Sequence, residues 1–89
     1  MKLLRNLAVA AAAVLGLSAQ AQVKIGVTLS ATGPAASLGI VEQNVFGLLP
    51  ASVQGTPVRF VVLDDGSDPT RAVQNARKLV TEEKVDVLI

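Results

Sequence analysis

The sequence contains no cysteine and no histidine. Without cysteine, the fold has no disulfide framework, and iron–sulfur clusters and thiolate zinc sites lack their ligands. Without histidine, these 89 residues also lack a common ligand of haem and zinc and the usual base that activates a serine nucleophile. We therefore expect no catalytic residue, no metal site and no cofactor in this chain.

Surplus positive charge is nearly absent too. The chain carries eight Lys and Arg residues against seven Asp and Glu residues, a net charge of +1. Lys2 and Arg5 stand in the first six residues, and without them six basic residues remain against seven acidic ones, a net charge of −1. The positive balance therefore belongs to the N-terminus, and we expect no nucleic-acid partner.

The first 21 residues have the three parts of a secretory signal peptide in the right order. The basic start is followed by an apolar run at residues 7–17, which is shorter than the roughly 20 residues needed to span a bilayer. Small residues at Ala19 and Ala21 then predict cleavage after Ala21. A buried core helix or a short anchor is the alternative. No cysteine for a lipid anchor follows, so we expect a mature protein released into the periplasm.

Three segments after the leader have the patterns of β-strands. Residues 23–29 place apolar side chains at every second position, and their more polar opposite face suits a strand near a sheet edge or under a helix. Residues 58–63 form an apolar, β-branched run typical of a strand covered on both faces, preceded by a turn at residues 54–57. Residues 85–89 are expected to form the third strand.

Two amphipathic helices are expected between these strands. The first spans residues 35–49 and ends before Pro50, which lacks a backbone N–H. The second begins with Asp68 as its cap and Pro69 in the first helical position. The apolar stripes predicted to pack on the sheet are Leu38, Val41, Val45 and Leu48 or Leu49 in the first helix, and Ala72, Val73, Ala76, Leu79 and Val80 in the second.

The order β-α-β-α-β with short connections predicts a parallel sheet with helices on its faces. Ligands of such folds bind at the carboxyl ends of the strands, which here means residues 30–38 and 64–68. A mature chain this short is marginal as a domain, and its last residues form a strand with no turn after it. We therefore expect residues 22–89 to be the N-terminal part of a longer protein.

The first loop does not have the glycine spacing of a dinucleotide-binding site. Gly33 and Gly39 do not fit G-x-G-x-x-G, and Pro34 removes one N–H donor. Asp64 follows Gly26 by 38 residues, whereas the acid that binds the ribose lies about 20 residues after the glycines. A nicotinamide cofactor is therefore disfavoured.

Two other features of the loops leave alternatives open. Asp64, Asp65 and Asp68 could hold Mg²⁺ or Ca²⁺, but the cap at Asp68 and the turn after Asp65 favour a structural role. The N–H groups and hydroxyls of residues 30–33, at the start of a helix, could hold a carboxylate or another anion. An ordinary turn closed by small polar residues explains them equally well.

Two motifs occur in order behind the signal peptide: Val-Lys-Ile-Gly-Val-Thr-Leu-Ser-Ala-Thr-Gly-Pro at residues 23–34, followed by Gly39, and Leu-Asp-Asp-Gly-Ser-Asp-Pro at residues 63–69, followed by Ala72-Val73. Together they closely resemble the opening of the leucine/isoleucine/valine-binding protein family. These proteins are the periplasmic solute-binding components of ABC importers for branched-chain amino acids and related small molecules.

The resemblance implies a type I periplasmic binding protein: two three-layer α/β lobes with parallel sheets, joined by a hinge and closing on a ligand. Residues 22–89 would supply the first strands and helices of the N-terminal lobe. In the family the ligand is held mainly by a loop after the third strand and by the second lobe. What carries over here is the first loop, which implies ligand-binding roles for Ser30, Thr32, Gly33, Ser37 and Leu38. Many members have an aromatic residue at the position of Leu38, which here is aliphatic.

The function implied is a non-enzymatic, monomeric binding protein that delivers a small carboxylate-bearing solute, such as a branched-chain or related amino acid, to a permease in the inner membrane. A binding protein for another small organic acid or amide, and a ligand-sensing receptor domain of the same fold, are the alternatives. An exported enzyme on a similar sheet would need a histidine or a metal-ligand cluster beyond residue 89.

Overall fold

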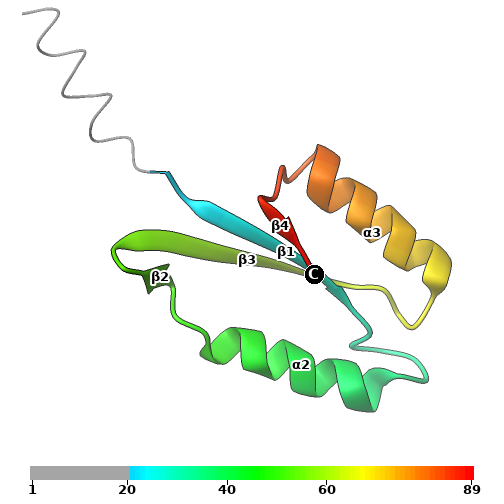
Figure 1. Cartoon of the computed structure of the whole chain (residues 1–89). Coiled ribbons are helices and arrows are strands. Elements are labelled where there is room, and N and C mark those ends of the chain that lie inside the picture. Colours follow the sequence, from blue (N-terminus) through cyan, green and yellow to red (C-terminus); the bar gives the residue numbers. More distant parts are fainter. Residues whose placement is uncertain (1–20) are drawn as a thin grey trace, which may run out of the picture.

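The computed structural model describes residues 21–89 (Figure 1). The expected leader, residues 1–21, lies outside the described residues except for Ala21. None of the helices in the described range has the length and apolar content needed to cross a membrane. The elements are β1 (Val23–Leu29), α2 (Ala36–Leu48), β2 (Ser52–Val53), β3 (Thr56–Asp64), α3 (Pro69–Thr81) and β4 (Val87–Leu88).

The predicted α/β fold with a largely parallel sheet is confirmed. The strand order is β2-β3-β1-β4, and β1 runs parallel to both β3 and β4. The register pairs Val23 with Val58 and Leu29 with Asp64, so the carboxyl ends of β1 and β3 lie side by side. β1 therefore has a central position rather than a place at the sheet edge, and its Gly26 is buried beneath Leu79 of α3.

The short strand β2 was not predicted. The turn is shorter than the one expected at residues 54–57, because Thr56 and Pro57 already belong to β3 and pair antiparallel with β2. Gln54 and Gly55 alone make the turn, with φ angles of 51° and 81°. Two central residues with positive φ are typical of tight hairpin turns.

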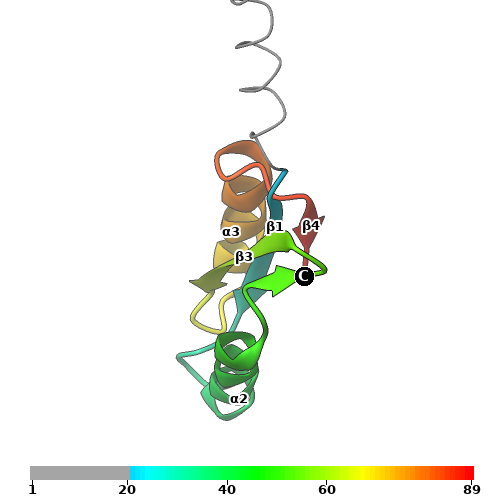
Figure 2. The same ribbon diagram turned by 90° about the vertical axis from the view of Figure 1, so that its left-hand side faces the viewer.

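The two helices lie on opposite sides of the sheet (Figure 1; Figure 2 shows the same ribbon turned by 90°). The chain crosses from β1 to β3 through α2, and returns past β1 to β4 through α3. Crossovers of the same hand that run in opposite directions place their helices on opposite faces. The buried apolar side chains of the described residues are Val27 and Leu29 of β1 and Leu79 of α3. Leu79 lies over Gly26 on one face of β1, whereas Val27 lines a cavity with Val45 and Phe46 of α2 on the other face.

Helix α2 contacts the sheet through a different face from the predicted one. Leu38 and Leu48 of the expected stripe are 69% and 85% exposed, and Val41 and Val45 are exposed as well. The buried position is Gly39. Nearer the C-terminal end of α2, Phe46 contacts the sheet, with its ring centroid 5.6 Å from that of Phe60 on β3. Apolar residues occur on most sides of α2, and close approach at the glycine decides which side meets the sheet.

Gly39 and Gly47 provide a matched test of this close approach. A Cβ at Gly39 would overlap the carbonyl oxygen of Ser30, whereas a Cβ at Gly47 meets nothing within 4 Å. We expect Gly39→Ala to destabilise the complete protein by about 1–3 kcal/mol through overpacking. Gly47→Ala should be neutral or stabilise by up to about 1 kcal/mol, because alanine is the better helix former. Urea unfolding measures both, and equal effects of the two substitutions would contradict this packing.

Candidate functional site

The candidate site is formed by two loops at the carboxyl edge of the sheet. The first loop, residues 30–35, joins β1 to α2, and the second loop, residues 65–68, joins β3 to α3. The parallel ladder continues into them, because the N–H of Asp65 donates to the carbonyl oxygen of Leu29 at 2.8 Å. The loops are therefore neighbours although residues 36–64 separate them in the sequence.

The Asp64 carboxylate, at the end of β3, connects the two loops. Its Oδ1 atom accepts from the backbone N–H groups of Ala31 at 2.9 Å, Thr32 at 3.3 Å and Gly66 at 2.9 Å. Its Oδ2 atom accepts from the Thr32 hydroxyl at 2.7 Å. The Thr32 hydroxyl, then the Gly66 N–H and the other amides, hold the pKa of Asp64 below its ordinary value of 3.8, although partial desolvation opposes them.

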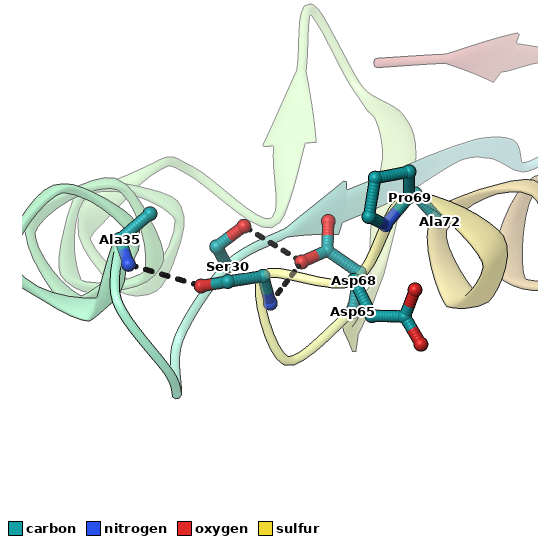
Figure 3. Close-up of a pocket in the computed structure, with 7 residues that line it drawn as sticks. Ser30, Ala35, Asp65, Asp68, Pro69 and Ala72 are labelled. Atoms are coloured by element: carbon teal, nitrogen blue, oxygen red, sulfur yellow. Dashed lines mark hydrogen bonds between the residues drawn. The ribbon is translucent and has the colours of Figure 1, made fainter.

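Asp65 makes a second connection, from a buried position. Its side chain is 8% exposed, and its Oδ1 atom accepts from the Ser30 hydroxyl at 2.6 Å and from the Ser67 N–H at 2.8 Å (Figure 3). The buried carboxylate thus has the hydrogen bonds that burial of a charge requires. This contact draws the end of β1 toward the turn at residues 65–67.

Ser67 completes the connection from the second loop to the start of α2. Its hydroxyl donates to the carbonyl oxygen of Thr32 at 2.8 Å and accepts from the Ala35 N–H at 3.0 Å. A φ of 61° gives its backbone the left-handed conformation of the turn. Asp68 then accepts from the N–H of Thr70, which confirms the predicted cap of α3.

Asn75 is a structural contributor that the sequence pattern did not identify. Its Nδ2 atom donates to the Thr28 hydroxyl at 3.2 Å and to the carbonyl oxygen of Asp64 at 3.1 Å. It therefore joins α3 to the ends of both β1 and β3. The signal in the sequence was an asparagine inside a predicted helix, where this residue type is unfavourable. The structure shows that this asparagine is half-buried.

The structure places the five residues expected to bind ligand in two groups. Ser30, Thr32 and Gly33 belong to the first loop, where the Ser30 hydroxyl donates to Asp65 of the second loop and the Thr32 hydroxyl donates to Asp64 at the end of β3. Ser37 and Leu38 lie in the first turn of α2 and are exposed. The N–H groups of residues 31 and 32, considered above for an external anion, here surround the chain's own Asp64 carboxylate.

A cavity of about 240 Å³ opens between the loops (Figure 3). Its polar lining comes from Ser30, Asp65, Ser67 and Asp68, and Ala35, Pro69 and Ala72 complete it. A more apolar cavity of about 370 Å³ lies between β1 and α2 and is lined by Val27, Thr28, Glu42, Val45, Phe46 and Ile89. Across residues 21–89, no group of three or more acidic, histidine or cysteine side chains is arranged to hold a metal ion.

An α/β layer structure with polar loops gathered at the carboxyl edge of a parallel sheet is a ligand-binding architecture. The family model for periplasmic binding proteins matches residues 22–89. The chain therefore belongs to the periplasmic binding protein family, and the predicted family resemblance is confirmed.

Solved structures support the same assignment. An extracellular ligand-binding receptor from Rhodopseudomonas palustris HaA2 is 55% identical, with a TM-score of 0.74 over 78% of this chain and 19% of the receptor. A solute-binding protein of an ABC transporter from Rhodopseudomonas palustris BisB5, in complex with 3,4-dihydroxybenzoic acid, is 27% identical with a TM-score of 0.70 over 75% of this chain and 20% of that protein.

A branched-chain amino acid transporter substrate-binding protein from Streptococcus pneumoniae, in complex with isoleucine, shares the fold. It is 24% identical with a TM-score of 0.64, over 76% of this chain and 21% of that protein. No curated protein matches the chain. The chain thus spans about a fifth of the length of the solved structures that it matches.

Gly33 and Gly55 provide a matched test of the contact between the loops. Both have positive φ, 82° and 81°, so alanine costs about 1–2 kcal/mol at either position for its backbone conformation. A Cβ at Gly33 would also lie 2.6 Å from the carbonyl oxygen of Gly66, whereas one at Gly55 meets nothing within 4 Å.

We therefore expect Gly33→Ala to lower the free energy of unfolding of the complete protein by about 1–3 kcal/mol more than Gly55→Ala does. Chemical denaturation of the two variants measures the difference. Equal losses would mean that the two loops do not approach each other closely at Gly33.

Proposed function

We propose that this chain forms the opening of the N-terminal lobe of an extracytoplasmic solute-binding protein of an ABC importer. The proposed ligand is a small carboxylate-bearing solute, and the proposed partner is a permease in the inner membrane. The observation that carries the proposal is the family match over residues 22–89. Relatives bound to isoleucine and to 3,4-dihydroxybenzoic acid support the ligand class, because a carboxylate is common to both molecules.

The proposed mechanism is binding and release without chemistry. The matched relatives are solute-binding or receptor proteins, not enzymes. A second lobe would close over the solute by hinge motion, and the closed form would be the one presented to the permease. We propose that the protein acts as a monomer in the periplasm after removal of residues 1–21.

The contribution of this chain to the ligand cleft is proposed to come from the first loop and the first turn of α2. Leu38 is 69% exposed at this edge, so it can contact the apolar part of a solute. Ser37 is its exposed neighbour. Ser30, Thr32 and Gly33 are proposed to form the wall behind these two residues, fixed by the hydrogen bonds to Asp65 and Asp64.

Sensing is the second candidate function. The relative with 55% identity is described as an extracellular ligand-binding receptor, and a receptor domain of this fold would bind its ligand in the same way. Deleting the permease genes of the host separates the two functions. If deleting the permease genes abolishes uptake of the bound solute, transport is supported. If uptake is retained in that strain, and deleting the gene for this protein abolishes a response to the solute, sensing is supported.

The ligand class is tested with the complete gene product isolated from the periplasm, whose intact mass should correspond to a chain beginning at Gln22. We expect a branched-chain amino acid or a hydroxybenzoate to raise its melting temperature. At a ligand concentration 100 times Kd the added stability is about 2.7 kcal/mol. Leucinamide, which keeps the side chain and amine of leucine but lacks the carboxylate, is the matched control. The proposal would be contradicted if leucine and leucinamide raised the melting temperature equally. It would also be contradicted if no compound of either class raised it.

A further inference from the structure

We propose that Asp64 is a positioning residue for solute binding. Its carboxylate holds the first loop, residues 30–35, in the shape that presents the first turn of α2 to the solute, and it does so without contacting the solute. The inference rests on the proposed function and assigns a role in solute binding to Asp64, for which the sequence favoured a purely structural role.

Both oxygens of Asp64 are already used within the protein. Oδ1 accepts three backbone N–H groups, two of them from Ala31 and Thr32, and Oδ2 accepts the Thr32 hydroxyl at 2.7 Å. Hydrogen bonds to an ionised acceptor are roughly twice as strong as neutral ones. The carboxylate therefore stabilises one conformation of residues 31 and 32 and has little capacity left for a ligand.

The chain between this contact and Leu38 is short and fixed at successive points. The Ala35 N–H donates to the Ser67 hydroxyl, and the Ala36 N–H donates to the carbonyl oxygen of Gly33 at 3.1 Å. Gly39 is then pressed against the backbone of Ser30. A change in the conformation of residues 31 and 32 consequently shifts the first turn of α2, which bears the exposed Leu38.

The Thr32 hydroxyl offers two explanations that can be separated. If Thr32 contacts the solute directly, removing its hydroxyl and removing the Asp64 carboxylate should weaken binding independently. If Thr32 acts through Asp64, the two removals break the same contact, and the double variant should be little worse than the more damaging single one. Non-additivity in a double-mutant cycle measures this coupling.

The experiment uses the complete protein with L-isoleucine and 3,4-dihydroxybenzoic acid as probes in titration calorimetry. The variants are Asp64→Ala, Thr32→Val and the double variant, with Thr32→Ser as the conservative rescue. Glu82→Gln is the charge control, because its exposed side chain makes no hydrogen bond or ion pair within the part of the chain that the structure describes. Amide hydrogen exchange of residues 31–39 is measured without solute.

We expect each single variant to raise Kd about three- to tenfold, because the binding-competent loop becomes only fractionally populated. The double variant should match the weaker-binding single variant. Thr32→Ser and Glu82→Gln should bind like the parent protein. In the absence of solute, exchange should accelerate at Ala31, Thr32 and the first turn of α2 in the variants that lose the contact.

The inference is overturned if the two single effects on Kd add, or if exchange at residues 31–39 is unchanged in Asp64→Ala. Binding of neither probe by the parent protein would count against the proposed ligand class alone, since hydrogen exchange reports the positioning independently. If Asp64→Ala does not fold, Asp64→Asn replaces it. This variant keeps an Oδ1 acceptor but loses the charge, and a Kd equal to that of the parent would overturn the role of the carboxylate.

Discussion

The connection between the two loops at the carboxyl edge depends on two consecutive aspartates. Asp64 ends β3 and accepts the amides of the first loop, while Asp65 turns inward and accepts the Ser30 hydroxyl. Parallel pairing of β1 with β3 brings the loops together, but the ladder alone leaves their N–H groups without partners. The carboxylates supply these partners, and the start of α2 follows from the loop that they hold.

The sequence contained most of the fold in its local patterns. Alternating apolar residues predicted β1, and Asp68 followed by Pro69 predicted the start of α3, because caps and periods are properties of neighbouring residues. The antiparallel strand β2 was missed because two residues are too few to show a period. The packed face of α2 was predicted wrongly. Apolar residues occur on several sides of this helix, so their spacing does not identify the side that packs on the sheet, and the close approach of Gly39 to the Ser30 backbone determines it.

The site was harder to predict than the fold, because its contacts are distant in the sequence. The hydrogen bonds from the first loop to Asp64 and Asp65 join residues 32 to 35 positions apart, and no spacing rule anticipates them. Sequence and resemblance located the loops at the correct edge. The ligand-binding roles of Ser30, Thr32, Gly33, Ser37 and Leu38 remain predictions, because their tests require the complete protein and a solute.

The contact that joins the loops is tested most directly by nuclear magnetic resonance titration of the complete protein through the acid range. The carboxyl carbon of Asp64 should titrate with a midpoint below the ordinary value of 3.8, since its hydrogen bonds favour the ionised form. The amide protons of Ala31, Thr32 and Gly66 should shift with the same midpoint. A midpoint at or above 3.8, or amides that do not follow the carboxyl group, would contradict a loop held by this carboxylate.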